Sequence, residues 1–569
     1  GLHARPLTKA ISGSRSKLTA MWLELLMMAA LAGPSAAENC FLPLAQPLPA
    51  HPMNGSAIAK MRKYFKANLN VDNTGAIVAS PGECPALMAC CNTCNGGYWY
   101  DWTRDGAIGI SVLQRLAKSK LASLGASDEI TEDYARATVK AYVKWISGRK
   151  RAGENLYLEP KWNITTGQPF KGNWCRPQTD GPGLRAMALM HYWWEKEPGL
   201  ADTRRLKGDA GKGHEAGKGH EEAGKDHEAG KGHETSKGHE RTTGLDEDGQ
   251  AIWDVIRSDL DWVADKGIQR PTCDLWEETK DHDFLWNRMT MRAALMHGHH
   301  MATSRHDPHR AQRYRQAAEV HLGDIVDDHL FKKKNHGMAP KAAPKDSGFL
   351  SECRAIGFGP CQRKRKHIDG SVILSLVHGG EHSGLKAPSL LAAATRPTSA
   401  VVARTVRHYN EAFCKVYKIN REDSEKGIPG ILYGRYMMDQ YGKGNPWVLI
   451  TASLATVFYR GARDVQAGHN VSREEVREWQ DALNWSGFTG SSKDFVAAGD
   501  AVLTRLAHHA RPDAWHLYEQ INKDTGRQYN ARDLTWSYAE VLLALVERQE
   551  VVTALEQEHG ESKPGDWWV

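Results

Sequence analysis

Apolar residues recur at helical spacing along most of the chain after residue 55. Positions three and four residues apart share one face of a helix, so this spacing predicts amphipathic helices. No long series of Val- and Ile-rich strands alternates with them, which argues against a parallel α/β barrel. The pattern predicts twelve helices, near residues 56–68, 105–122, 130–147, 181–196, 249–266, 285–303, 308–329, 367–378, 397–418, 444–464, 493–509 and 531–549.

The number of helices and their connections predict an all-α fold. Twelve helices joined by loops of unequal length suggest antiparallel hairpins, since short connections place consecutive helices side by side. We therefore expect a single domain with an (α/α)6 barrel, a toroid of six helical hairpins in which outer helices surround inner ones. In such a toroid the functional residues should gather on loops at one end.

Residues 207–240 interrupt this pattern with a low-complexity insertion. They repeat a unit similar to Lys-Gly-His-Glu-Ala-Gly and contain almost no apolar side chains. Such a segment cannot offset the entropy cost of ordering its backbone, so we expect it to be disordered. Its regularly spaced histidines are compatible with transition-metal binding, but a tolerated loop insertion is the simpler interpretation.

The beginning of the chain has the pattern of a processing segment. Residues 21–37 read MWLELLMMAALAGPSAA, a short apolar run followed by proline and small residues. This pattern is typical of a secretory signal peptide, and the run is too short to span a bilayer. Residues 1–20 lack an initiator methionine, and we interpret them as an upstream or non-native segment. We therefore expect a secreted protein, or one in the lumen of the secretory pathway.

The ten cysteines agree with an oxidising compartment. Four of them lie within residues 84–94, and Cys353 and Cys361 bracket another loop, which predicts disulfides. Cys91 and Cys94 have C-x-x-C spacing, but no second pair at zinc-site spacing accompanies them, so we expect no metal site. Glycosylation sequons, which agree with secretion, occur at Asn54, Asn163, Asn470 and Asn484.

Composition is that of an ordinary globular protein. Charged residues make up 25% of the chain and hydrophobic residues 41%. The formal net charge of +6 is a small excess of 74 basic over 68 acidic side chains. It does not indicate a polyanion partner, so we expect neither nucleic-acid nor membrane binding, and we expect a monomer.

The segment Cys273-Asp274-Leu275-Trp276-Glu277-Glu278 carries the first candidate chemistry. Adjacent side chains do not share a face, so at most one of the two glutamates should point into a given cleft. A carboxyl group held against indole loses solvation of its charged form and can keep a proton for a leaving-group oxygen. The alternative is structural, because Asp274 and Glu277 have the D-x-x-E spacing of a helix capping box.

Four other stretches combine aromatic residues with charged or amide side chains near helix ends. Aromatic faces stack on the C–H faces of sugars, while arginine and aspartate pair with neighbouring hydroxyl groups. Each stretch alone is compatible with a core aromatic or an interface loop, but together they favour a sugar site. They are Tyr98-Trp99-Tyr100-Asp101-Trp102-Thr103-Arg104-Asp105, residues 174–182 (WCRPQTDGP), Gly434-Arg435-Tyr436, and residues 515–520 (WHLYEQ).

In these motifs the chain resembles the catalytic domain of glucoamylases (glucan 1,4-alpha-glucosidases), glycoside hydrolase family 15. The similarity covers almost the whole chain after residue 38 and implies a catalytic domain over residues 38–569 with an (α/α)6 barrel. The resemblance rests on GAIVASP (75–81), YWYDWTRD, LEPKWN (158–163), WCRPQTDGPGLRA, IWDVIRSDLDWVA (252–264), DLWEE, GRY, NPW (445–447), YEQ and ARDLTWSYA (531–539).

The resemblance implies roles for individual residues. Glu277 would be the general acid and Glu519 the general base. The residues expected to bind the substrate or to assist around the cleaved bond are Tyr98, Trp102, Arg104, Asp105, Trp174, Arg176, Asp180, Glu278, Arg435, Trp447 and Trp536.

These roles describe an inverting, exo-acting hydrolase that needs no metal or organic cofactor. Glu277 would protonate the bridging oxygen while Glu519 activates a water on the opposite face, with the two carboxyl groups roughly 6.5–9.5 Å apart. β-D-Glucose would leave from non-reducing ends of α-1,4 and, more slowly, α-1,6 glucans. The expected partners are soluble starch, dextrins and malto-oligosaccharides.

Two alternatives and two departures accompany the resemblance. The chain could act on trehalose or isomalto-oligosaccharides with the same fold, or it could bind glucans without catalysis. Cys175 and Cys273 occupy positions where the family commonly carries other residues, and we expect a disulfide between them. No starch-binding module or Ser/Thr-rich linker is expected, so raw granules should be poor substrates.

Overall fold

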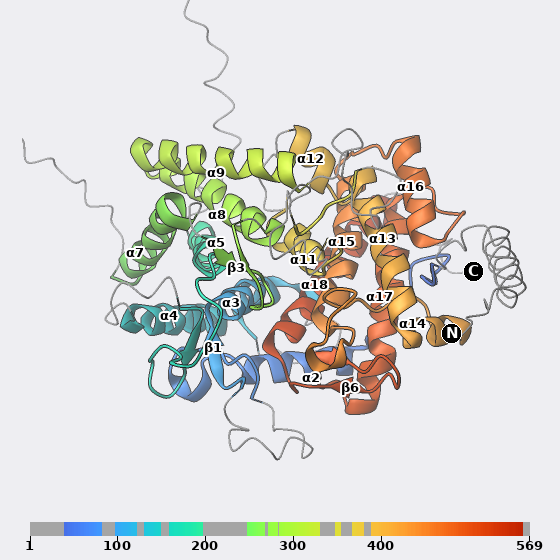
Figure 1. Cartoon of the computed structure of the whole chain (residues 1–569), viewed down its shortest axis with the longest axis horizontal. Helices are drawn as coiled ribbons and strands as arrows, with labels where there is room; N and C mark the ends of the chain where they lie inside the picture. Colours follow the sequence, from blue (N-terminus) through green and yellow to red (C-terminus); the bar gives the residue numbers. More distant parts are fainter. Residues whose placement is uncertain are drawn as a thin grey trace, which may run out of the picture.

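The computed structural model shows a helical protein in which six inner helices form a closed ring (Figure 1). Each inner helix packs against the next, and the last returns to the first. They are α3 (Thr103–Lys118), α5 (Asp180–Lys196), α8 (Leu285–Ser304), α11 (Ser371–His378), α15 (Val448–Gln466) and α18 (Thr535–Gly560). The residues described are 39–81, 97–121, 130–149, 159–196, 247–267, 271–282, 284–329, 348–353, 367–380 and 389–560.

Six outer helices alternate with the inner ones along the chain. Helices α4, α7, α9 and α17 each pack against the inner helix that precedes them, and α2 packs against α18. Figure 1 shows one such pair, α8 and α9, side by side at the top. This arrangement confirms the expected (α/α)6 barrel. The outer helices are α2 (Gly55–Ala67), α4 (Glu132–Arg149), α7 (Glu247–Trp262), α9 (Pro308–Asp328), α13 (Ala400–Val416) and α17 (Ser492–Ala510).

The two layers differ in how much of each helix is buried. In α15 every residue from Val448 to Ala462 is buried, as expected for a helix surrounded by protein. In the outer helix α2, the buried apolar residues recur with helical spacing on one face, at Ile58, Met61 and Phe65. The width of the apolar face of a helix therefore indicates whether the helix lies in the inner or the outer layer.

Within the described residues, three short helices were not predicted, α12 (Ser389–Thr395), α14 (Lys418–Glu425) and α16 (Arg473–Leu483). They cover the barrel without contributing to its inner ring. Three two-stranded antiparallel sheets, also not predicted, lie in the connecting loops. Their strands are β1 (Tyr100–Trp102) with β2 (Lys161–Asn163), β3 (Thr272–Cys273) with β4 (Lys280–Asp281), and β5 (Gln520–Ile521) with β6 (Gln528–Tyr529).

Two disulfides join distant parts of the described chain. Cys175 and Cys273 are bonded, with 5.9 Å between their Cα atoms, which confirms the expected pair. Cys40 and Cys414 form a second disulfide that the sequence did not predict. Residues 1–38, the cysteines at positions 84–94, Cys361 and the insertion at 207–240 lie outside the described residues.

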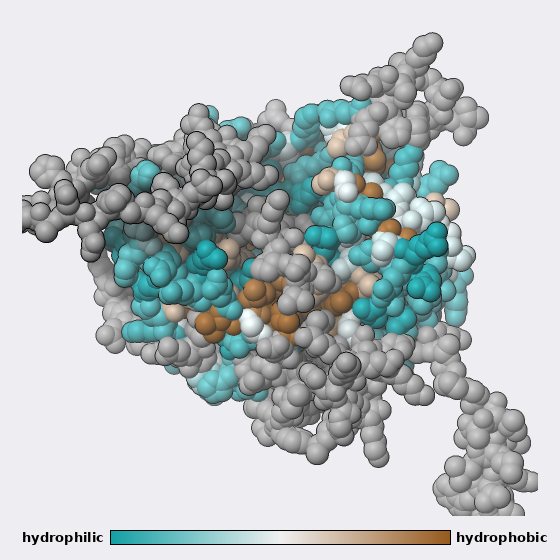
Figure 2. Space-filling model, turned by 90° about the horizontal axis from the view of Figure 1, so that it is seen from above, coloured by the Kyte–Doolittle hydropathy of each residue, from teal (hydrophilic) through white to brown (hydrophobic). Residues whose placement is uncertain are grey.

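The described surface is mainly polar. Figure 2 views the molecule from above the orientation of Figure 1 and shows hydrophilic residues over most of the described surface, with a smaller hydrophobic group near the centre. None of the described helices combines the length and the apolar run needed to cross a membrane.

Candidate active site

A cavity of about 980 Å³ lies at the end of the barrel where the inner helices begin. Arg104 and Asp105 reach it from the first turn of α3, Trp447 from the residue before α15, and Trp536 from the first turn of α18. Eleven of the thirteen predicted site residues line it, namely Tyr98, Trp102, Arg104, Asp105, Trp174, Glu277, Glu278, Arg435, Trp447, Glu519 and Trp536.

The loop between β3 and β4 presents Glu277 and Glu278 to this cavity. Asp274 organises the turn, because its Oδ1 accepts the backbone N–H groups of Glu278 and Thr279, both at 2.8 Å. Glu277 has a φ of +64°, in the left-handed region that residues with side chains rarely adopt. No helix begins here, so the capping-box alternative is wrong.

The expectation that only one of the two glutamates would face a cleft is also wrong. Both Glu277 and Glu278 line the cavity. The expectation assumed regular backbone geometry, whereas the left-handed conformation of Glu277 turns the chain sharply between the two side chains. Strain of this kind is retained in folded proteins mainly at functional positions.

Glu277 is held by three N–H donors. Its Oε1 accepts hydrogen bonds from Trp102 Nε1 at 2.9 Å and from Arg104 Nη2 at 3.0 Å. Its Oε2 accepts one from Trp174 Nε1 at 2.7 Å. The indoles therefore orient this carboxyl group through their N–H edges, and Arg104 adds a direct ion pair.

Glu278 faces the same cavity in a different electrostatic setting. Arg435 Nη2 donates to its Oε1 at 2.7 Å, and the hydroxyl of Tyr436 donates to its Oε2. Asp439 fixes Arg435 from the other side through a hydrogen bond of 2.8 Å from Nε. Both oxygens of Glu278 therefore accept hydrogen bonds within the protein, as both oxygens of Glu277 do.

Glu519 approaches from the loop between α17 and α18 and is only 3% exposed. Burial raises the pKa of its carboxyl group to about 7, although hydrogen bonds from neighbouring side chains oppose this rise. The donors are the hydroxyl of Tyr98 at 2.7 Å, Gln520 Nε2 at 3.1 Å and Asn530 Nδ2. Such a carboxyl group exchanges protons near neutral pH.

Arg104 and Asp105 form a polar corner beside Glu277. Arg104 Nη1 donates to Asp180 at 3.1 Å and to Gln178 at 3.0 Å, so the guanidinium is fixed from behind. Asp105 is 6% exposed, and burial raises its pKa to about 7. Its Oδ2 accepts no hydrogen bond from the protein, with Arg104 Nε 3.7 Å away. This oxygen is therefore a buried acceptor without a hydrogen-bond donor in the protein.

The two remaining predicted residues lie behind the cavity wall. Asp180 does not line the cavity, and its Oδ2 is occupied by Arg104 and, at 2.8 Å, by Trp286 Nε1. Arg176 does not line it either, because its guanidinium pairs with Glu159 at 2.6 Å and donates to the carbonyl of Trp174 at 3.0 Å. Both positions hold cavity residues in place instead of facing a ligand.

Lys161 is a cavity residue that sequence reasoning missed. Its ammonium lies 4.0–4.5 Å from the ring centroids of Tyr100, Trp102, Phe170 and Trp174. Burial lowers its pKa to about 8. The signal was present in the LEPKWN segment, but only the pairing of Lys161 with Trp102 across β1 and β2 shows that this lysine enters the site.

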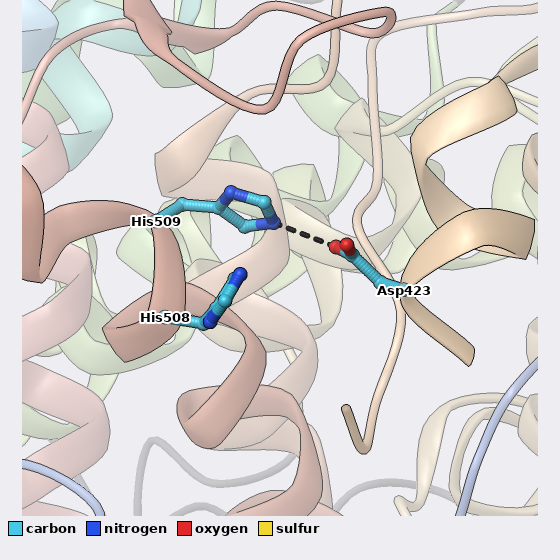
Figure 3. Close-up of side chains that lie close together, drawn as sticks. All are labelled: Asp423, His508 and His509. Atoms are coloured by element: carbon cyan, nitrogen blue, oxygen red, sulfur yellow. Dashed lines mark hydrogen bonds and ion pairs between the residues drawn. The ribbon is translucent and has the colours of Figure 1, made fainter. Parts of the chain in front are cut away.

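One cluster outside the cavity has the spacing of a metal site. Asp423, His508 and His509 are the group of three potential ligands found among the described residues, within 4.8 Å of one another (Figure 3). Asp423 already accepts from His509 Nε2 at 2.8 Å, and Arg505 Nη1 lies 3.5 Å from the same oxygen. A divalent ion would add uncompensated charge beside Arg505, so we interpret the cluster as an ion-pair network.

Residues 56–546 match the model of the glycosyl hydrolases family 15. The chain belongs to this family. It is therefore a glycoside hydrolase, and the family match spans both candidate catalytic glutamates.

Curated relatives of this family 15 chain are named glucoamylases. A glucoamylase of Blastobotrys adeninivorans is 25% identical over 532 residues, 88% of this chain and 72% of that protein. A probable glucoamylase of Schizosaccharomyces pombe is 24% identical over 501 residues, 84% of this chain and 86% of that protein.

Solved structures support the same fold. The glucoamylase from Saccharomycopsis fibuligera superposes with a TM-score of 0.63 at 20% identity, covering 89% of this chain and 98% of that chain. The family 15 glucoamylase from Hypocrea jecorina has a TM-score of 0.61 at 22% identity, covering 87% of this chain and 71% of that chain.

Proposed function

We propose that this family 15 hydrolase is an inverting, exo-acting glucoamylase that releases β-D-glucose from the non-reducing ends of α-1,4 glucans, and more slowly from α-1,6 branches. The observation that carries the proposal is the placement of Glu277 and Glu519, 242 positions apart in the sequence, in the wall of one aromatic cavity. An inverting hydrolase requires two such carboxyl groups, one as acid and one as base.

Glu277 is the proposed general acid and Glu519 the proposed general base. Without a ligand, the surroundings alone favour the reverse assignment, because Glu519 has a pKa near 7 while Glu277 pairs with the Arg104 cation. We propose that the hydroxyl groups of a terminal glucose bind Arg104 and Asp105 and weaken the hold of Arg104 on Glu277.

The aromatic wall favours a sugar as the ligand. Tyr98, Trp102, Trp174 and Trp447 line the cavity with aromatic rings, which suit the C–H faces of glucose. Soluble starch, dextrins and malto-oligosaccharides are the proposed substrates, in line with the relatives named glucoamylase. The reaction as proposed uses only protein side chains and water.

Secretion is also a proposal. The disulfides Cys40–Cys414 and Cys175–Cys273 favour an oxidising compartment. A relative in Saccharomyces cerevisiae, 24% identical over 84% of this chain, is named an intracellular sporulation-specific glucoamylase, so the family also has an intracellular member. Fractionation of the native host, with culture medium and cell lysate assayed separately, tests the location.

The decisive experiment is an NMR time course of maltoheptaose hydrolysis that records the anomeric protons of glucose within the first minute. We expect β-glucose to accumulate first and α-glucose to appear later by mutarotation. Initial release of α-glucose would overturn inversion, and initial release of maltose or longer fragments would overturn exo action on single residues. Parallel rates on isomaltose and trehalose define the preferred linkage.

A further inference from the structure

A second cavity lies at the opposite end of the barrel, where the inner helices end. It has a volume of about 380 Å³ and is lined by side chains from all six inner helices. Arg115 reaches it from the last turn of α3, His378 is the last residue of α11, and Arg463 lies in the last turn of α15. The volume falls in the range of small-molecule sites. Residues of the proposed catalytic cavity do not line it.

Three arginines surround one enclosed carboxylate in this second cavity. Glu547 is fully buried and accepts hydrogen bonds from Arg115 at 2.7 Å and from Arg460 at 2.8 Å, while Arg463 Nη1 forms an ion pair with its Oε2 at 2.9 Å. Glu550 pairs with Arg115 and Arg463 from the outside. Two carboxylates therefore balance three guanidinium groups, which leaves one positive charge in excess at the cavity.

Several polar atoms in the lining have no partner within the protein. Arg460 is 6% exposed, and its hydrogen bonds run from Nε to Glu547 and from Nη1 to the carbonyl of Val377, which leaves Nη2 without one. Arg463 uses only Nη1. Gln114, 4% exposed, donates to two backbone carbonyls, while its Oε1 accepts nothing. A buried acceptor such as Gln114 Oε1 is normally paired.

We propose that this cavity is a binding site for a small hydroxylated organic anion, either a hydroxy acid or a phosphate ester. The excess guanidinium charge would bind its carboxylate or phosphate group, because arginine N–H donors match these oxygens in geometry. A hydroxyl group would satisfy Gln114 Oε1. The apolar side chains of Met187 and Leu543 in the lining would contact its carbon skeleton.

The two cavities have no described lining residue in common, and the fully buried Glu540 connects their walls. Its Oε1 accepts from Trp536 Nε1, which lines the catalytic cavity, at 2.7 Å and contacts His378 Nε2, which lines the second cavity, at 2.6 Å. An anion in the second cavity therefore should not compete with glucose, and the proposal does not depend on the reaction proposed above.

Isothermal titration of the full chain with citrate and with inorganic phosphate, at constant ionic strength, tests the site. We expect one equivalent to bind with glucose present or absent. Preference for citrate indicates a hydroxy acid, and preference for phosphate indicates a phosphate ester. Arg463→Gln, whose side chain is 35% exposed, should fold normally and weaken binding about tenfold, since it removes one charge-assisted contact.

A second variant tests the cavity without changing any charge. Ser111 is half-buried on α3 and lines the space, so Ser111→Phe should fill it and abolish binding. The matched control is Arg473→Gln, an exposed position at the start of α16 far from the cavity in the fold, which should bind as the parent does. If neither anion binds, or if Ser111→Phe and Arg463→Gln bind like the control, the proposal is wrong.

Discussion

The two ends of the barrel bury the same kind of side chain in opposite electrostatic settings. At the end where the inner helices begin, Glu519 is held by the neutral donors Tyr98, Gln520 and Asn530, and burial raises its pKa to about 7. At the other end, Glu547 is equally buried, but three arginines hold the pKa of its carboxyl group well below the ordinary value despite the cost of burial. Burial alone therefore does not decide the charge of a glutamate in this fold.

The two buried glutamates also affect the stability of the folded protein in opposite directions as the pH changes. Because the folded-state pKa of Glu519 is raised, its contribution to stability is fully present below the ordinary glutamate pKa and is lost as the pH rises toward 7. The pKa of Glu547 is lowered, so its contribution is present above the ordinary value and is lost as the pH falls through the folded-state pKa. Ionised Glu519 therefore lowers the stability of the folded protein at one end of the barrel, whereas ionised Glu547 raises it at the other end.

The largest expected effect separates the two proposed catalytic roles. Glu277→Gln and Glu519→Gln should each reduce kcat on maltoheptaose by about 10³-fold or more, because each removes one proton-transfer group. α-D-Glucosyl fluoride needs no protonation of its leaving group. We therefore expect Glu277→Gln to retain most activity on the fluoride, while Glu519→Gln loses activity on both substrates.

Steady-state rates on the two substrates, with circular dichroism to confirm folding, measure this difference. Equal losses on the fluoride would show that Glu277 is not the acid. Retention of fluoride hydrolysis in Glu519→Gln alone would reverse the two roles, which is the assignment that the ligand-free electrostatics favour.

At the other end of the barrel, the expected effect is on stability. Glu547→Gln leaves three guanidinium groups close together with only Glu550 to balance them, so it should lower the free energy of unfolding by about 3–5 kcal/mol. Glu550→Gln is the control, because its side chain is 46% exposed and surface ion pairs contribute about 1 kcal/mol or less. Urea unfolding followed by fluorescence compares them. Equal midpoints for the two variants would contradict the difference between the buried and exposed carboxylates.

The smallest expected effect is a change in the pKa of Glu519. The hydrogen bond from Asn530 lowers this pKa, so Asn530→Ala should raise it. The base acts when deprotonated, so the acid limb of kcat/KM against pH should move upward by about 0.7 unit, since one hydrogen bond is worth about 1 kcal/mol. Tyr98→Phe removes a second donor and should move the limb in the same direction. A shift to lower pH in either variant would exclude Glu519 as the group that limits this limb.

The helical layout could be predicted because apolar spacing is a local property. All twelve barrel helices were anticipated, with ends within four residues of those observed, except that α18 continues to Gly560 instead of ending near residue 549. Helix α16 was missed although Ser472 and Glu475 form a capping box and Val476, Trp479 and Leu483 recur on one face. Helix α14 had no such signal, since most of its residues are charged. The capping box in the sequence could therefore have predicted α16, which the apolar spacing alone did not.

The sequence predicted the site residues that belong to recognisable motifs, but not the residues that only the tertiary structure brings to the cavity. Glutamates, arginines and indoles gathered in a few stretches pointed to a sugar site, and the family resemblance supplied their roles. Lys161 and Asn530 were missed because lysine and asparagine are common on surfaces, and only tertiary pairing brings them to Trp102 and Glu519. The left-handed conformation of Glu277, which allows two adjacent glutamates to face one cavity, has no signature in the local pattern.

The polarity of the inner helices also determines where the histidine-rich insertion is attached. It joins α5, which starts beside the catalytic cavity with Asp180 and therefore ends at the far side, to α7, which runs back toward the loop that carries Glu277. Both attachment points thus lie on the face remote from substrate entry. Attachment of the protein to a solid support through the last turn of α5 or the first turn of α7 should therefore leave the cavity that contains Glu277 and Glu519 facing the solution.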